Sequence, residues 1–366
     1  MTKLLPFTTI FPKALGTGII IQSSQSLDKD TYDYCAQTIT QFENNLSRFL
    51  ENSIVSQISR ANQGGSFTFP QYCEPLFENY DMLFSITHGA IDPCIGEDLS
   101  HIGYDATLRF TLDADENSLG AIHGRTQWNH LPSDTNMQTL NEKNTANDLN
   151  IYTANYSTEN PIITRNRTIL RTTQNVQLDF GACGKGLLVD ILFHTLHNQH
   201  GINSLLINAG GDIRCHTPEP IIIGLEDPNN TDNAIGQIAI KSGAICASAP
   251  SRRHWQLASG QKVHHILNAI DGLPSKQTAA TWVYINEENT YATMFADGLS
   301  TALFVDDAHQ IVNEYLDYMK YYKQHNKHTD TDFHMNFPST FPQVAILYEN
   351  NRVLCINKHD IDFFTS

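Results

Sequence analysis

The sequence predicts an α+β fold in one large domain, and three observations support this. First, the 366 residues are 40% hydrophobic, so the chain can bury a sizeable core and is not a disordered protein. Second, short β-like runs and longer helix-like segments follow one another without the regular βαβ rhythm of a doubly wound sheet. Third, the sequence contains no internal repeat at the periods of solenoid proteins.

The first ninety residues predict one strand and two helical regions. A glycine-flanked, β-branched run over residues 16–22 predicts a strand. Apolar residues recur at helical spacing over residues 28–62, and the turn-like segment 51–53 interrupts that pattern. A further helix is predicted over residues 75–88, where Gly89 can serve as its C-cap.

Residues 112–161 change the character of the chain. Asn, Thr, Ser and Asp dominate this segment, and its apolar residues do not cluster. A segment of this composition cannot bury enough apolar surface to form a core of its own. It is therefore interpreted as a polar, partly flexible insertion within the single domain, which spans residues 1–366.

Regular structure is predicted again after residue 162. The expected helices cover residues 185–198, 291–304 and 308–324. The expected strands are short, alternating or β-branched runs that share a high β-propensity. They cover residues 162–170, 176–180, 204–208, 221–225, 238–241, 282–285, 344–348 and 353–356.

Charge and composition exclude several classes of function. The chain has 23 basic and 39 acidic residues, a net charge of −16, which disfavours nucleic acid as a partner. Seven cysteines lie far apart with no Cys-x-x-Cys pair, so zinc-ribbon and thioredoxin-like sites are not supported, and reduced, buried thiols are expected. Prolines interrupt the N-terminal segment, and no apolar run could cross a bilayer. A soluble, cytoplasmic protein without a signal peptide, lipobox or transmembrane segment is expected.

The segment LDFGACGKGLLVD at residues 178–190 passes from a predicted strand through a glycine-rich turn into a helix. Its glycines allow a backbone to approach a ligand closely, and a helix N-terminus suits a phosphate group. It is not a Walker A loop, because Gly186 stands where Ser or Thr must follow Lys185. A helix entry with one exposed lysine is the alternative interpretation.

Two further segments combine turns with polar residues. In INAGGDIR, at residues 207–214, Asp212 either caps a tight turn or contacts a ligand. In VHHILNAIDGLPS, His264 and His265 are adjacent on a predicted strand, so at most one of them faces a given pocket. The pair alone is weak support for a general base or a metal ligand, because the chain contains 16 histidines.

The segment FADGLSTALF, at residues 295–304, fits a helix with one apolar face. Asp297 and Thr301 are four residues apart and therefore lie one turn from each other on the same face. A carboxylate and a hydroxyl at this spacing can both bind a hard cation such as Mg²⁺. The alternative is a solvated helical face on which the threonine bonds to an upstream carbonyl.

Taken together and in this order, these segments resemble the ApbE family of FAD:protein FMN transferases. The resemblance covers nearly the whole chain and rests on eight short motifs. They are ALGTGIII (14–21), LSRFLENSIVSQISRAN (46–62), THGAIDPCIG (87–96), DFGACGKGLLVD (179–190), INAGGDIR (207–214), IIIGLEDP (221–228), HILNAIDGLP (265–274) and ADGLSTALF (296–304).

The resemblance implies a mixed-sheet fold with packed helices, related to the T-fold. It also implies a Mg²⁺-dependent enzyme that cleaves FAD, releases AMP and attaches FMN through a phosphoester bond to a Thr or Ser of a partner flavoprotein. The acceptor segment would read D-x-x-[ST]-G-A-[ST]. His265 takes the place of the family's catalytic base, and the metal would be held by the side chains of Asp297 and Thr301 and the carbonyl of Ala182. The implied flavin contacts fall on Leu15, Phe49, Ala90, Ile91, Asp92, Asp179, Lys185 and Leu267.

The sequence departs from the family's pattern in two places that bear on the pocket. Asn268 and Ala269 replace the Asp-Pro that usually follows the histidine. Residues 247–250 keep only Ser248 of the usual A-T-S-G. Two alternatives to the transferase therefore stay open: an FAD pyrophosphatase that forms FMN and AMP, and a non-enzymatic protein that binds or stores FAD.

Overall fold

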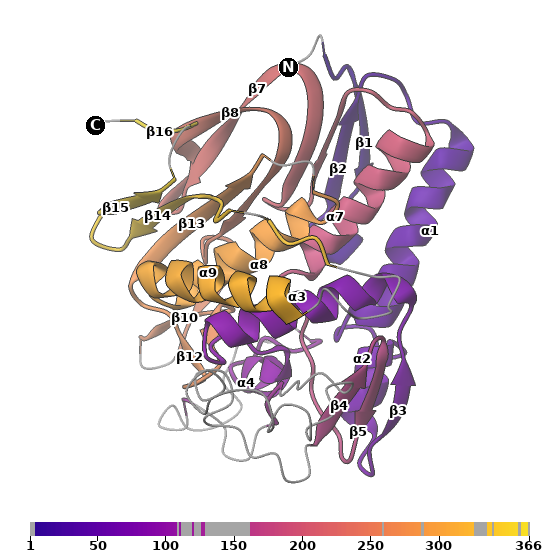
Figure 1. Ribbon diagram of the computed structural model, residues 1–366, viewed down its shortest axis with the longest axis vertical. Helices are drawn as coiled ribbons and strands as arrows, with labels where there is room; N and C mark the ends of the chain where they lie inside the picture. Colours follow the sequence, from indigo (N-terminus) through magenta and orange to yellow (C-terminus); the bar gives the residue numbers. More distant parts are fainter. Residues whose placement is uncertain are drawn as a thin grey trace.

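A curved antiparallel sheet forms the centre of the molecule (Figure 1). The computed structural model describes residues 4–107, 110, 119–120, 126–128, 162–257, 260–286, 289–325, 335–338, 340–357 and 360–364. Its largest sheet has nine strands in the order β1-β2-β6-β7-β8-β13-β14-β15, with β16 paired to β8, and every described pair is antiparallel. The strands are β1 (Phe7–Phe11), β2 (Ile19–Ser23), β6 (Leu205–Asn208), β7 (Ile213–Asp227), β8 (Asn230–Ser248), β13 (Thr278–Ile285), β14 (Gln343–Tyr348), β15 (Val353–Ile356) and β16 (Ile361–Phe363). Strands from both ends of the chain thus share one sheet.

Both faces of this sheet are buried along its central strand β13. Along β13, Val283 and Ile285 point into the core beneath the helices, whereas Trp282 and Tyr284 point to the opposite face. This alternation follows from the two-residue period of a strand. The opposite face is covered by the long β7–β8 hairpin, which curls over it (Figure 1), and by Ile361 of β16. The fold is therefore α+β, as the sequence predicts.

The helices gather on one side of the sheet. α8 lies against β8 and β13, packs side by side with α7, and is covered in turn by α3 and α9 (Figure 1). Apolar residues surround α8 on almost all sides, as expected for a helix in the middle of a core. The helices are α1 (Lys29–Leu46), α2 (Ile54–Arg60), α3 (Glu74–Ile86), α4 (Gly96–His101), α7 (Gly184–His194), α8 (Ala292–Val305) and α9 (Ala308–His325).

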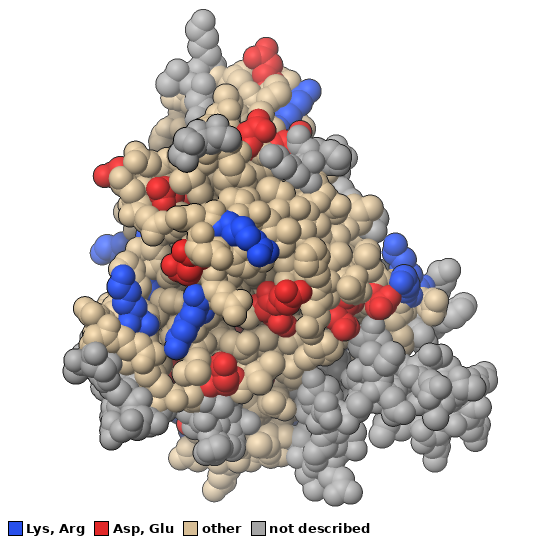
Figure 2. Space-filling view, turned by 90° about the vertical axis from the view of Figure 1, so that its left-hand side faces the viewer, with Lys and Arg blue, Asp and Glu red and all other residues tan. Residues whose placement is uncertain are grey.

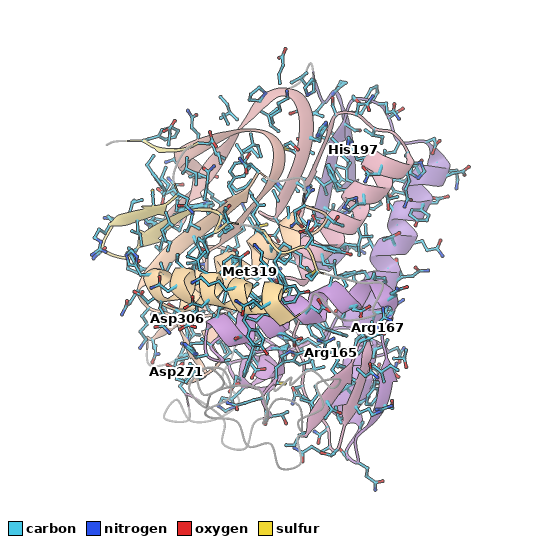
Figure 3. All side chains as sticks on the ribbon, in the orientation of Figure 1. Arg165, Arg167, His197, Asp271, Asp306 and Met319 are labelled. Atoms are coloured by element: carbon cyan, nitrogen blue, oxygen red, sulfur yellow. The ribbon has the colours of Figure 1, made fainter. Side chains whose placement is uncertain are left out.

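Two ion pairs connect a smaller, three-stranded sheet to α3. It has the order β3-β5-β4, with bounds Gly65–Thr68, Ile169–Thr172 and Ile163–Asn166. Arg165 pairs with Asp81, and Arg167 Nε lies 2.7 Å from Glu74 Oε1; both acidic residues belong to α3 (Figure 3). Two short hairpins, β9–β10 and β11–β12, complete the described strands: His254–Gln256, Lys262–His264, Leu267–Asn268 and Leu273–Pro274.

Most predicted elements are confirmed, and the differences have simple causes. The helical region 28–62 is split into α1 and α2, and the helix predicted at 185–198 is α7 followed by a π-helical turn, Thr195–Gln199. The strand predicted at 176–180 is wrong. Its side chains alternate between buried and partly exposed positions, but the segment joins no sheet and leads directly into the glycine-rich turn. The region 162–170 belongs to two strands, β4 and β5, rather than one.

The remaining predictions concern the insertion and the surface. The predicted insertion at 112–161 lies outside the described residues, apart from 119–120 and 126–128. In the described part of the chain, no helix combines the length and apolar character needed to span a membrane. On the face shown in Figure 2, acidic and basic side chains are interspersed among a majority of uncharged residues.

Candidate active site

The candidate site is built around one buried carboxylate. Asp297 is the only charged residue of α8, and only 2% of its surface is exposed. Lys185, from the first turn of α7, places its Nζ 3.1 Å from Asp297 Oδ1 and 3.2 Å from Oδ2. The same Nζ lies 3.0 Å from Oδ2 of Asp212, which stands in the turn between β6 and β7. Three segments that are distant in the sequence therefore meet at one ammonium group.

This group of charges is not balanced. When both carboxyls are ionised, the two carboxylates and one ammonium carry a net charge of −1 in a buried place. Burial, and next to it the charge of Asp212, raise the pKa of Asp297, and Lys185 opposes only part of that shift. Burial disfavours the Lys185 ammonium, but Asp212 and Asp297 together outweigh it and raise the pKa of Lys185. A bound cation would relieve the remaining negative charge.

Gly186 allows α7 and α8 to come this close. Its N–H donates to Asp297 Oδ2 at 3.0 Å. A Cβ at this position would lie 2.4 Å from the carbonyl oxygen of Thr293 and 2.8 Å from Cα of Met294, both in α8. Only a residue without a side chain fits between the two helices. The glycine of the predicted phosphate-type turn thus serves helix packing and the orientation of Asp297.

We expect Gly186→Ala to destabilise the protein by about 1–3 kcal/mol, the usual cost of overpacking a core, and to separate Asp297 from its backbone donor. Chemical denaturation followed by circular dichroism measures the first effect. Gly184→Ala is the matched control, because the nearest atom to its Cβ would be Phe180 Cβ at 3.8 Å. Equal stability of the two variants would contradict the packing argument.

A group of oxygen atoms adjoins Asp297. Thr301 Oγ1 lies 3.3 Å from the carbonyl oxygen of Ala182 and 3.2 Å from that of Asp297. Ser248 Oγ lies 3.3 Å from Thr301 Oγ1 and 2.7 Å from Ser300 Oγ. Thr301 Oγ1 therefore meets the main-chain carbonyls of Ala182 and Asp297, the second of which is the upstream carbonyl of the alternative interpretation. The carboxylate of Asp297, one helical turn away, contacts Lys185 and Gly186.

The chemistry of these donors fits a hard divalent cation. A carboxylate, a hydroxyl and a backbone carbonyl are all oxygen ligands, which Mg²⁺ prefers. Among the described residues, no three His, Cys, Asp or Glu side chains are grouped as a metal centre. Mg²⁺ commonly binds through one or two carboxylates and completes its shell with water and substrate phosphates, so one aspartate suffices. Lys185 Nζ contacts both oxygens of the Asp297 carboxylate, so a cation bound there would be a second positive group on the same carboxylate.

The rings of Phe49 and Tyr104, here called the aromatic wall, lie beside the glycine-rich turn. Arg48 pairs with Asp179 through Nε and donates from Nη2 to the carbonyl of Tyr104 at 2.5 Å. Its guanidinium carbon lies 4.3 Å from the centre of the Phe49 ring and 5.0 Å from that of Tyr104. The two rings meet edge to face at 5.5 Å. Asp179 also accepts the N–H of Gly181 at 2.7 Å, so this wall is joined to the turn that carries Ala182.

His265 lies against the same wall. Its ring centre is 5.6 Å from that of Tyr104, and its Nδ1 is 3.3 Å from the carbonyl oxygen of Arg253. A carbonyl can only accept, so the proton sits on Nδ1 and Nε2 keeps its lone pair. Burial first, and then the nearby charge of Arg253, lower the pKa of His265 to about 3. His264 points elsewhere, with Nε2 2.9 Å from the carbonyl of Ser275.

The other predicted flavin contacts occupy different environments. Leu15 adopts a left-handed backbone conformation (φ 54°) and donates its N–H to Glu43 at 2.9 Å. Leu267 is buried with Tyr104 in one apolar cluster. Ala90 and Ile91 are buried, and the carbonyl of Ala90 accepts the N–H of Ala269 at 2.9 Å.

The carboxylate of Asp92 is occupied by hydrogen bonds from two backbone N–H groups. It accepts the N–H of Cys94 at 2.7 Å and lies 3.3 Å from the N–H of Trp128.

Sequence reasoning missed several residues of the site. Tyr104 lies in no motif, although it contacts Phe49, His265 and the guanidinium of Arg48. Arg48 had a weak signal, since it stands next to Phe49 inside a recognised motif. For Asp212 both interpretations had been open; its carboxylate faces Lys185 rather than its own turn.

Comparisons with known proteins agree with this architecture. A profile of the ApbE family matches residues 15–322. A protein named FAD:protein FMN transferase from Klebsiella pneumoniae is 21% identical over 235 residues, which cover 62% of this chain and 58% of the relative. Its namesake from Vibrio cholerae is 21% identical over 257 residues, covering 68% and 66%. A third, from Treponema pallidum, is 25% identical over 151 residues, covering 38% and 40%. The chain thus spans between 40% and 66% of the length of these curated relatives.

Solved structures show the same fold. The ApbE protein from Thermotoga maritima superposes with a TM-score of 0.64 at 19% identity, covering 96% of this chain and 97% of that one. The flavin transferase ApbE from Vibrio cholerae gives a TM-score of 0.64 at 16% identity with the same coverage. Likeness at this identity establishes the fold, and the family profile spans most of the sequence. The chain therefore belongs to the ApbE family.

Proposed function

We propose that this protein is an FAD:protein FMN transferase. The observation that carries the proposal is the buried carboxylate of Asp297, which Lys185 and Gly186 hold between α7 and α8. One helical turn further, the hydroxyl of Thr301 lies 3.3 Å from the carbonyl oxygen of Ala182. Relatives with this name in three bacteria support it. In the proposed reaction a Thr or Ser hydroxyl of a partner flavoprotein forms a bond to the flavin-side phosphorus of FAD. The bond from that phosphorus to the bridging oxygen breaks, and AMP leaves.

Mg²⁺ would be held by the carboxylate of Asp297, the hydroxyl of Thr301 and the carbonyl of Ala182. When bound, it would neutralise charge on the pyrophosphate oxygens. Ser248 supports this arrangement, because its hydroxyl lies against both Thr301 and Ser300 and restricts the rotation of the Thr301 side chain. Lys185, partly exposed beside Asp297, adds positive potential at the start of α7.

His265 is the proposed general base. Its unprotonated Nε2 would accept the proton of the acceptor hydroxyl, while the carbonyl of Arg253 holds Nδ1–H and fixes the ring. The flavin would lie along the wall of Phe49 and Tyr104, whose faces can stack on its rings. Leu15, Leu267, Asp179 and the backbone at Ala90, Ile91 and Asp92 are the further proposed contacts. The cytoplasmic location predicted from the sequence stays a prediction.

The proposal is tested with purified protein, FAD, Mg²⁺ and an acceptor that carries a D-x-x-[ST]-G-A-[ST] segment. We expect AMP by chromatography and an acceptor heavier by one FMN, less the water lost in forming the ester, by intact-mass measurement. An acceptor with Ala at the modified Thr or Ser is the control. FMN and AMP formed at a rate that the acceptor does not change would identify a pyrophosphatase instead. FAD binding without AMP release at any Mg²⁺ concentration would identify a storage protein.

A further inference from the structure

Three cationic side chains lie around the candidate site, and their charges are compensated differently. Arg48 is paired with Asp179, and Lys185 lies between Asp212 and Asp297. Arg253 forms no ion pair with any residue that the structure describes. It is nevertheless partly buried, which is costly for a cation that lacks a counter-charge.

The surroundings of Arg253 use only part of its hydrogen-bonding capacity. Nη1 donates to the hydroxyl of Tyr104 at 2.7 Å, and the guanidinium carbon lies 5.9 Å from the centre of that ring. Nη2 is the atom nearest to the place where a Cβ of Gly16 would stand, at 4.0 Å. Gly16 is glycine with φ +66°, so no side chain fills the space in front of Nη2.

The position of Arg253 relates it to the reacting end of the proposed substrate. Its carbonyl orients His265, and Gly16 follows Leu15 directly in the sequence. The main chain of Arg253 thus contacts the proposed base, and its guanidinium lies near Gly16, the neighbour of a proposed flavin contact. Among the described residues only the Tyr104 hydroxyl accepts a hydrogen bond from this guanidinium, and the remaining N–H groups of its planar fork match two oxygens of a phosphate.

From these contacts we infer that Arg253 binds the flavin-side phosphate of the dinucleotide, an inference that rests on the proposed function. Its guanidinium would donate to non-bridging oxygens of the phosphorus that the acceptor attacks. Arg253 thus acts at the anionic end of the substrate, whereas the net negative group of Asp297, Asp212 and Lys185 attracts the cation. The site would then recognise FMN and FAD through their shared phosphate and riboflavin through its ring alone.

The test compares binding of riboflavin, FMN, FAD and AMP to wild type and Arg253→Met by flavin fluorescence and calorimetry. Loss of charge-assisted hydrogen bonds should weaken the binding of FMN and FAD by about 10- to 100-fold and leave the affinities for riboflavin and AMP unchanged. Arg253→Lys should lie between the two, because it keeps the charge but not the planar fork. Arg252→Met is the matched control: Arg252 is exposed and pairs with Glu226.

Each other result would overturn the inference. If riboflavin binding is weakened as much as FMN binding, Arg253 is a packing residue of the aromatic wall. If only AMP binding is weakened, Arg253 lies on the adenosine side of the dinucleotide. If Arg253→Met unfolds at the wild-type temperature and binds FMN with wild-type affinity, Arg253 does not contact the phosphate. These results are separate from the proposed function, because a wild-type protein that binds FMN more tightly than riboflavin but modifies no acceptor would refute only the transferase.

Discussion

Replacing Asp297 by Asn is expected to abolish transfer of FMN while the chain still folds. The substitution keeps the shape of the side chain but removes the charge that would hold the cation. Lys185 retains Asp212 as its counter-charge at 3.0 Å, so no buried ammonium is left alone. Loss of one strong electrostatic contact to the transition state typically costs about 10²–10³ in rate, and loss of the metal with it should exceed that range.

Two measurements separate the role of Asp297 in metal binding from a general loss of structure. The first is AMP release with FAD and acceptor; the second is binding of Mn²⁺ in place of Mg²⁺, followed by electron paramagnetic resonance without any turnover. Asp306→Asn is the control, since Asp306 is the C-cap of the same helix, about two and a half turns after Asp297. Wild-type affinity for Mn²⁺ in the Asp297 variant would contradict the proposed ligand.

The part of the site that the sequence predicts best is the part that depends on local spacing. Asp297 and Thr301 share one helical face in the structure because four residues complete about one turn, and their surroundings follow from helix periodicity. The glycine-rich entry to α7 is also a local pattern, but the reason for a glycine at position 186 is the close approach of α8, which is a tertiary contact. The resemblance to the family rests on the order of the motifs, and it predicted which helices and turns would come together in the site.

Residues that depend on tertiary packing could not be predicted in this way. Tyr104 follows α4 without a motif, and only the folded chain brings it to Phe49 and His265. Arg253 has no special context in the sequence, and its lack of a carboxylate partner among the described residues is a property of three-dimensional placement. The strand predicted at 176–180 failed for a related reason: alternating burial indicates a strand, but a partner strand is also needed.

The second large effect is expected for His265→Ala, which removes the proposed base. Transfer should fall by about 10²–10⁴-fold, the usual contribution of a general base, while FAD binding stays within about twofold of wild type. His264→Ala is the matched control, because the neighbouring ring bonds to the carbonyl of Ser275 and faces Phe304 rather than Tyr104. Equal losses in both variants would show that the hairpin, not the imidazole, is what the reaction needs.

The pH dependence gives an independent check on His265. Its pKa is lowered to about 3, so the ring is neutral and its Nε2 lone pair is unprotonated throughout the range from pH 5 to pH 8. An unshifted histidine would become protonated as the pH falls through about 6.5, and kcat/KM would fall with it. We therefore expect kcat/KM to show no acid limb near pH 6.5 that depends on His265. The contradicting result is an acid limb near pH 6.5 that appears in wild type and in the His264 variant but not in the residual activity of the His265 variant. It would show that burial and the Arg253 charge do not lower the pKa of this ring.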